Sequence, residues 1–307
     1  METFTTLLSN ITPLYVIIAL GWVAGRFYDV DRQSLANLAI YIVVPIVSFY
    51  YVASLEFRAA YIALPIVVFL LFSAITILFF AIGKKAYLDK RANLLAMCAG
   101  AGNTGYFGLP IVILLFPVEW VGLYVFALSG GLMYEATVMY YIANRGNFSP
   151  LESVHRVLKF PVLYAILLGL FINLIGLKLP EQLNPYWEYL QGAYVVVGMM
   201  IIGCALSKVS KLVMSLKFIS LVFIAKFLVF PVVALGLVML DRHAIGLFEP
   251  EVHQLVMIMA IMPPAANITA FATQLNISPE KAATTVLAGT VFALFYIPLM
   301  LIVLGIN

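Results

Sequence analysis

The sequence predicts an all-α polytopic membrane protein with ten transmembrane helices. Hydrophobic residues make up 64% of the 307 residues and charged residues 10%, whereas about 25% charged residues is usual for a soluble domain. So few charged side chains cannot cover a soluble surface of this size, which excludes a soluble enzyme or binding domain. A net charge of +3 provides no basic surface for nucleic acid. Cys98 and Cys204 lie in separate apolar segments and indicate neither a disulfide framework nor a metal site.

Ten apolar segments supply the expected spans, because a helix needs about 20 residues to cross a hydrocarbon core. The segments are too long and too continuous for the strands of a membrane barrel. The first lacks the basic flank and cleavage site of a signal peptide and is therefore interpreted as a span. The predicted spans are 12–27, 35–53, 61–82, 92–116, 118–142, 160–175, 189–206, 216–240, 254–275 and 282–304.

The basic residues predict the orientation of these spans. Of the 17 Lys and Arg residues, thirteen lie in or beside the connections that follow odd-numbered spans, and three lie on the opposite side. The remaining one, Lys226, falls inside a span. Because cytoplasmic connections carry the excess of Lys and Arg, the thirteen are expected in the cytoplasm. Both termini are therefore expected outside the cytoplasm, in the plasma or inner membrane.

An internal repeat divides the chain into two sets of five spans. In the first and sixth spans, a Gly follows a Pro by eight residues. In the fourth and ninth spans, Asn103 aligns with Asn267, and a Phe follows four residues later in both. An odd number of spans per repeat inserts the second copy upside down. We therefore predict inverted repeats at 1–142 and 160–307, joined by a cytoplasmic connection at 143–159.

The strongest helix breakers of the chain lie in the matched fourth and ninth spans. Gly102 belongs to a segment with four glycines and Pro110, and the ninth span contains Pro263 and Pro264. Both breaks lie roughly 15 Å from their nearest flank at 1.5 Å per residue, so they are expected to cross near the membrane midplane. Two half-helix N-termini and two asparagine amides would then face an anion. The simpler reading is that small residues only let helices pack closely.

Two ionisable residues fall inside spans, Glu135 in the fifth and Lys226 in the eighth. A charge inside a membrane span is costly unless it is paired or solvated. Lys226 could add positive potential to an anion site, with Glu135 as its partner or as a proton-coupling group. Alternatively, the two form an ion pair that only fixes two helices together. His155, His243 and His253 lie in connections, where solvation is expected.

Four motifs in chain order resemble the auxin efflux carrier family, which includes plant PIN-type carriers and bacterial dicarboxylate carriers. They are Val-Pro-Ile-Val-Ser-Phe at 44–49, Asn-Thr-Gly-Tyr at 103–106, Gly-Cys-Ala-Leu-Ser at 203–207 and Met-Pro-Pro-Ala-Ala-Asn-Ile-Thr-Ala-Phe-Ala at 262–272. The resemblance covers nearly the whole chain. Two departures stand out: the connection 143–159 is short, and Ala-Gly-Asn replaces Asn-Pro-Asn at 101–103. Both point toward a microbial type of organic-anion carrier.

The resemblance implies a scaffold of spans 1–2 and 6–7 and a moving domain of spans 3–5 and 8–10. It also implies a substrate site where spans four and nine cross, and a homodimer. Asn103 and the backbone of 263–267 would hold the substrate carboxylate, with Ser48 facing it from the scaffold. The full set of candidate substrate-binding residues is Ser48, Gly102, Asn103, Thr104, Tyr106, Lys226, Pro263, Pro264 and Asn267, with Glu135 as the coupling candidate.

The predicted function is secondary active transport of small organic anions, such as malate, malonate or auxin-like acids, by alternating access. The partners are the anion, the bilayer and a proton as candidate coupling ion; no cofactor, metal or nucleic acid is expected. One alternative is a sodium-coupled symporter of the bile-acid type, and another is a membrane receptor or sensor without flux. An intramembrane enzyme is not expected, because no span holds the nucleophile and base that hydrolysis requires.

Overall fold

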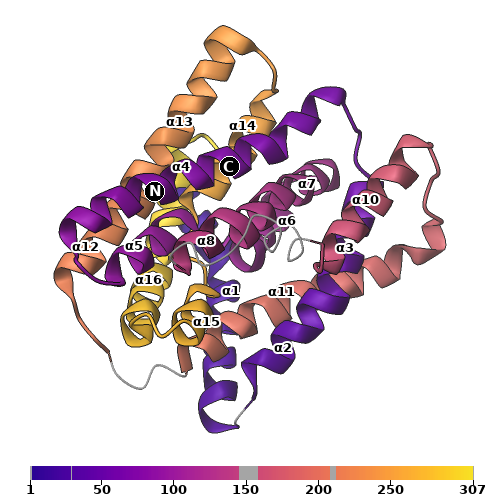
Figure 1. The fold of residues 1–307 in the computed structure, drawn as a ribbon. Coiled ribbons are helices and arrows are strands. Elements are labelled where there is room, and N and C mark those ends of the chain that lie inside the picture. Colours follow the sequence, from indigo (N-terminus) through magenta and orange to yellow (C-terminus); the bar gives the residue numbers. More distant parts are fainter. Residues whose placement is uncertain (1, 29, 145–157, 208–211, 307) are drawn as a thin grey trace.

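The computed structural model describes residues 2–28, 30–144, 158–207 and 212–306, which form helices joined by short connections (Figure 1). Among these residues there is no β-strand, only an isolated bridge between Gly102 and Pro264. The prediction of an all-α membrane protein is confirmed by this helical content and by the apolar character of the helices. Of the predicted connection 143–159, residues 145–157 lie outside the described residues.

In the first half of the chain, capping residues mark where helices begin. The carboxylate of Asp31 accepts hydrogen bonds from the backbone N–H groups of Gln33 and Ser34, which satisfies two of the free donors at a helix start. The helical segments are α1 (Glu2–Phe27), α2 (Arg32–Leu38), η1 (Ala39–Val43), α3 (Val44–Ala53), η2 (Ala59–Ile62), α4 (Ala63–Ala86), α5 (Arg91–Gly100), η3 (Thr104–Gly108), α6 (Leu109–Leu115), α7 (Val118–Tyr134), η4 (Glu135–Met139) and α8 (Tyr140–Ala143).

In the second half, prolines mark several helix starts. Pro161, Pro250 and Pro279 are each the first residue of a helix, where the missing N–H group has no intrahelical partner to lose. The helical segments are α10 (Pro161–Leu174), η5 (Glu181–Leu183), α11 (Asn184–Ser207), α12 (Leu216–Ile224), η6 (Ala225–Val229), α13 (Phe230–Leu240), η7 (Asp241–Ile245), α14 (Pro250–Ile261), α15 (Ile268–Gln274) and α16 (Pro279–Val303).

Seven helices in the described part of the chain are long and apolar enough to cross a membrane. The remaining predicted spans are shorter: the sixth corresponds to α10, and the fourth and ninth are interrupted. The first helix begins at Glu2, ten residues before the predicted start. The reason is that hydropathy detects only the apolar part of a helix, whereas backbone hydrogen bonding continues through the polar residues that precede it.

Wide helical turns of the π type precede three prolines. The segments η1, η3 and η6 end two residues before Pro45, Pro110 and Pro231, respectively. A proline inside a helix has no N–H group for the carbonyl four residues earlier, and its ring collides with that carbonyl, so the helix widens locally. The carbonyl freed by Pro231 belongs to Phe227, and the Tyr296 hydroxyl donates to it at 2.8 Å.

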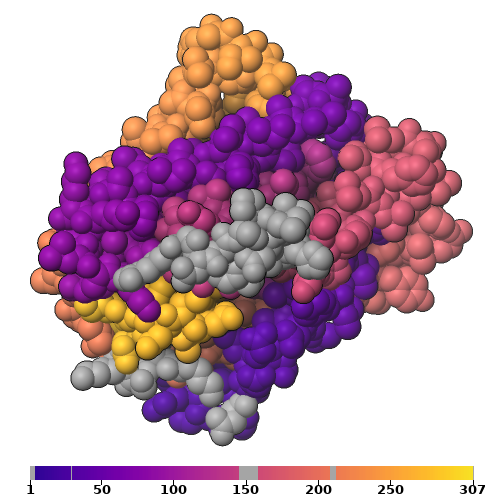
Figure 2. All heavy atoms as spheres, in the orientation of Figure 1, coloured from indigo at the N-terminus to yellow at the C-terminus, as the bar shows by residue number. Residues whose placement is uncertain are grey.

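Two helix pairs are formed by segments far apart in the sequence: α1 packs along α11, and α3 packs along α10. Glycines permit the close approach, since a Cβ atom at Gly21 would lie 2.5 Å from the carbonyl oxygen of Met200, and one at Gly169 would lie 2.8 Å from that of Phe49. The helix α4 packs against α5 and α7. In the space-filling view, α4 forms a purple band across one face, and the orange α13 and α14 project beyond it (Figure 2).

Candidate functional site

The two interrupted spans meet through their backbones. Between α5 and η3, and between α14 and α15, the chain leaves the helix and the two segments pair antiparallel at Gly102 and Pro264. The N–H group of Asn103 donates to the Pro263 carbonyl at 2.8 Å, and that of Ala265 donates to the Ala101 carbonyl at 3.1 Å. Each segment therefore satisfies part of the backbone that the other leaves unpaired, as irregular backbone in a membrane requires.

Tyrosine hydroxyls stabilise the start of the second half of the fourth span. The hydroxyl of Tyr124 donates to the carbonyl of Thr104 at 3.0 Å, and that of Tyr194 donates to the carbonyl of Gly105 at 2.7 Å. The rings of Tyr194 and Tyr106 lie against each other with centroids 6.5 Å apart. Because Tyr194 belongs to α11 and Tyr124 to α7, helices from both halves of the chain hold this turn in place.

A cavity of about 370 Å³ borders the crossing. One side follows a stripe on the second span, at Arg32, Ala36, Ile40, Val44 and Ser48, which share a helix face because they recur every four residues. The opposite side contains the crossing and one face of α15, from Asn267 to Gln274. The predicted site residues that line the cavity are Ser48, Gly102, Asn103, Thr104, Tyr106, Glu135 and Asn267.

Three predicted site residues do not line this cavity. Pro263 and Pro264 belong to the crossing through their backbones, and the ring of Pro264 packs against α16, where a Cβ atom at Gly289 would lie 2.7 Å from its Cδ. Lys226 lies behind the crossing and is fully buried. Its ammonium would lie 2.9 Å from a Cβ atom at Gly102, so a side chain at that position would displace it.

The buried charges do not pair with each other as one hypothesis predicted. The Glu135 carboxylate accepts a hydrogen bond from the side-chain amide of Asn267 at 2.9 Å. The Lys226 ammonium has no hydrogen-bond partner and lies 4.1 Å from the ring centroid of Phe230, at cation–π distance. The predicted structural ion pair is therefore wrong, because Glu135 faces the ninth span and Lys226 faces the back of the fourth.

Polar atoms that have no partner gather at the crossing. They include the amide nitrogen of Asn103 and the amide oxygen of Asn267, both buried. A buried polar group without a hydrogen bond costs about 1–3 kcal/mol, so such atoms in a cavity wall indicate a place where a polar ligand supplies the missing bonds. The segment η3 also begins here, and the first N–H groups of a helix have no partner within it.

Arg32 lines the cavity, a position that the sequence reasoning missed. Its guanidinium reaches across to the ninth span, where Nη2 lies 3.4 Å from the Ala266 carbonyl and Nη1 lies 3.5 Å from the Thr269 hydroxyl. The charge count had assigned this residue to the cytoplasmic flank. Asp31 directly before it could have indicated this position in the sequence. Aspartate often caps the start of a helix, which places Arg32 in the first turn of the span.

His253 also differs from its expected solvated position. It lies in the first turns of α14, and its Nε2 is 2.8 Å from Oδ2 of Asp241, with side chains only 11% and 10% exposed. Asp241 additionally accepts hydrogen bonds from the backbone N–H groups of Leu247 and Phe248, both at 3.0 Å. The pair therefore joins the start of the turn between α13 and α14 to the first turns of α14. The other histidine described, His243, is exposed.

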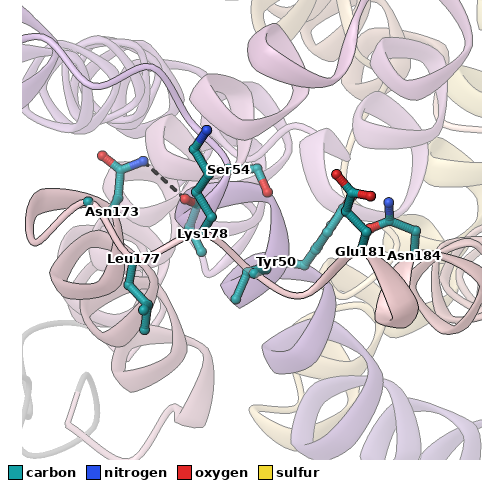
Figure 3. A pocket seen from close by; sticks show the side chains of 10 residues that line it. Tyr50, Ser54, Asn173, Leu177, Lys178, Glu181 and Asn184 are labelled. Carbon is teal, nitrogen blue, oxygen red and sulfur yellow. Dashed lines mark hydrogen bonds between the residues drawn. The ribbon is translucent and has the colours of Figure 1, made fainter.

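A second cavity, of about 360 Å³, lies beside the C-terminal ends of α3 and α10 (Figure 3). Asn173 is the half-buried polar group here, and its amide donates to the carbonyls of Ala53 and Leu55. Lys178, Glu181 and Asn184 are exposed at its rim. Because the Asn173 amide is already bonded and Lys178, Glu181 and Asn184 are exposed to solvent, this cavity is the weaker candidate for a ligand site.

Long apolar helices around a cavity at two interrupted helices define a multi-pass membrane transport protein. The chain belongs to the membrane transport protein family, whose sequence profile matches residues 6–149 and 148–301. This membership confirms the resemblance to auxin efflux carriers. The chain is also 26% identical over 297 residues to an uncharacterized transporter of Methanocaldococcus jannaschii. The alignment covers 92% of this chain and 94% of that protein.

Proposed function

We propose that this transporter is a secondary carrier of small organic anions, with carboxylates such as malate, malonate or auxin-like acids as its substrates. The observation that carries the proposal is the cavity at the crossing, whose wall contains buried polar atoms of Asn103 and Asn267 without partners. A carboxylate has about four acceptor positions. It can therefore accept from the Asn103 amide and from backbone N–H groups in the first turn of η3 at the same time.

Electrostatics favour an anion over a neutral ligand at this position. The start of the helix formed by η3 and α6 carries the positive end of the helix dipole, and backbone N–H groups at such a start bind carboxylates. Lys226 lies on the other side of Gly102 and, when protonated, adds positive potential without touching the cavity. Ser48 supplies a hydroxyl from the second span.

Transport follows from movement of one group of helices against the other. We assign spans 1–2 and 6–7 to a scaffold and spans 3–5 and 8–10 to a mobile domain, which carries the crossing. The glycine-mediated packing of α1 on α11 and of α3 on α10 supports a rigid scaffold. The cavity lies between the scaffold stripe from Arg32 to Ser48 and the crossing, so a sliding of the two surfaces would move the substrate across the membrane.

Coupling to protons is assigned to Glu135. Its carboxylate lines the cavity and bonds to Asn267, a residue of the crossing. Protonation would change both the charge of the cavity and the acceptor offered to Asn267, so the proton and the anion would influence each other's binding. The carrier is further proposed to act as a homodimer in the plasma membrane with both termini outside the cytoplasm.

Reconstitution into liposomes tests the proposal. Labelled malate, malonate and indole acetate are offered to vesicles loaded with the unlabelled compound, under imposed pH and sodium gradients. We expect counterflow of at least one carboxylate that responds to the pH gradient. Flux that requires sodium would instead support a bile-acid-type symporter. Binding without counterflow would support a receptor, and the absence of both for every carboxylate would reject an anion carrier.

A further inference from the structure

Arg32 is the cationic residue that reaches into the cavity from the scaffold side. It begins the stripe of cavity-lining residues on the second span, and its guanidinium extends to α15 on the mobile side. Its acceptors there are Ala266 and Thr269, on either side of Asn267 in the sequence. The guanidinium therefore lies beside the same part of the ninth span as the crossing and can contact an anion bound there.

The bonds that Arg32 makes in this structure are few and long. Both lie at 3.4–3.5 Å, whereas charge-assisted hydrogen bonds from guanidinium groups are typically 2.7–2.9 Å. The Nε atom is buried and has no partner at all. A guanidinium offers five N–H donors in a planar fork that matches a carboxylate, so most of its capacity is unused.

The positive charge of Arg32 is also uncompensated within the described part of the chain. Arg32 forms no ion pair there. The carboxylate that lines the same cavity, Glu135, bonds to Asn267. A partly buried charge without a counter-charge is costly. An anionic ligand in the cavity would supply the missing counter-charge.

We propose that Arg32 binds the acidic group of the transported anion directly and so makes the cavity select anions over neutral ligands. The anion takes the place of the long bonds from Arg32 to Ala266 and Thr269. Without substrate, Arg32 links the scaffold to the mobile domain through its own bonds. With substrate bound, the anion forms this link instead. This role rests on the proposed function, but it assigns the contact to a residue of the scaffold rather than to Lys226, which lies outside the cavity.

Binding to purified protein tests the selectivity. Malonate is compared with malonamide, and indole acetate with indole acetamide, because each amide keeps the shape and loses the charge. For Arg32→Gln we expect the carboxylates to bind about ten- to a hundredfold more weakly, as for a lost bond to a charged group, with the amides unchanged. Arg32→Lys keeps the positive charge but loses the planar guanidinium, so its carboxylate affinity should lie between those of the unaltered protein and Arg32→Gln. Arg26→Gln is the matched control, since Arg26 is exposed and lies outside the cavity.

A second measurement uses the unaltered protein, so it does not depend on the folding of a variant. Phenylglyoxal modifies arginine side chains, and mass spectrometry follows Arg32 and Arg26 separately. Malonate or indole acetate should slow the modification of Arg32 at least about threefold, whereas the amides should not, and Arg26 should be unaffected by either.

The outcomes separate this inference from the proposed function. If the unaltered protein neither binds nor transports any carboxylate, the proposed function fails. If it transports a carboxylate, yet Arg32→Gln keeps the preference for anion over amide, or the carboxylate leaves the modification of Arg32 unchanged, Arg32 is not an anion ligand and only this inference is overturned.

Discussion

The backbone N–H of Asn103 donates a hydrogen bond to the carbonyl oxygen of Pro263 across 2.8 Å, which links the two interrupted spans directly. A second bond from Ala265 to Ala101 runs in the opposite direction. Because Pro263 and Pro264 have no N–H group, this segment cannot continue the helix of α14, and its carbonyl is free to accept. The two spans therefore fix each other's geometry, and the Asn103 side chain remains available to the cavity.

Replacement of Asn103 by alanine should weaken substrate binding without much loss of stability. Its amide nitrogen has no partner in this structure, so no protein hydrogen bond is lost, and the free energy of unfolding should fall by less than about 1 kcal/mol. Affinity for the transported carboxylate should fall about tenfold or more. Equilibrium binding and thermal unfolding of the same detergent-solubilised sample measure the two effects.

The matched control is Asn93→Ala in the same span. The buried Asn93 amide donates to the Ile142 carbonyl at 2.6 Å, so its loss removes a buried hydrogen bond and should cost about 1–3 kcal/mol of stability. Substrate affinity should not change, since Asn93 does not line the cavity. Equal effects of both variants on affinity would show that the Asn103 amide is not a substrate contact.

Gly100→Ala should destabilise the end of α5. A Cβ atom there would collide with the hydroxyls of Thr76 and Tyr134, which are themselves hydrogen-bonded at 2.5 Å. Overpacking of this kind typically costs about 1–3 kcal/mol, measured as a lower unfolding temperature. In Gly236→Ala the new methyl group meets nothing within 4 Å, and the helix should be unchanged or more stable. An unaffected Gly100→Ala protein would show that this packing relaxes freely.

Glu135→Gln should remove the pH dependence of transport. Glutamine keeps a carbonyl oxygen that can accept from Asn267, but it cannot bind and release a proton. Counterflow at equal pH on both sides should therefore persist, while a pH gradient should no longer drive uptake. Glu119→Gln, at the exposed start of α7, is the control for loss of a carboxylate. Uptake by Glu135→Gln that still follows the pH gradient would assign the proton to another group.

Lys226→Met should raise stability and lower anion affinity. The ammonium is fully buried and has no hydrogen-bond partner, so its replacement by an apolar chain of similar length removes a desolvation cost. The cavity loses positive potential at the same time, and anion affinity should fall by at least about threefold. Lys85→Met, which removes an exposed lysine in the last turn of α4, should change neither. Unchanged anion affinity in Lys226→Met would leave this lysine without a part in binding.

The sequence allowed the helical class and the breaks in the fourth and ninth spans to be predicted, because both depend on local chemistry. Apolar segments specify the spans, and Gly102, Pro263 and Pro264 specify where a helix cannot continue. The wide turns before Pro45, Pro110 and Pro231 follow from the same rule and could have been predicted too.

The side-chain partners could not be predicted, because they depend on how each span is rotated and tilted against the others. Glu135 and Lys226 both fall inside predicted spans, yet Glu135 bonds to Asn267, and Lys226 faces Gly102 and Phe230. Arg32 was assigned to a flank because residue counts ignore the reach of a long side chain. Contacts of this kind require the packed structure.

The turn between α13 and α14 provides a last prediction, away from the cavity. Asp241 there accepts three hydrogen bonds, from His253 and from the N–H groups of Leu247 and Phe248. In Asp241→Asn, one acceptor oxygen becomes an NH₂ group that faces a donor. The bond on that side is lost, and stability should fall by about 1–3 kcal/mol, measured by thermal unfolding. Arg242→Gln, at the adjacent exposed position, should be neutral. Carboxylate affinity should not change in either variant, since neither residue lines the cavity; a weakened affinity in Asp241→Asn would show that this turn is coupled to the crossing.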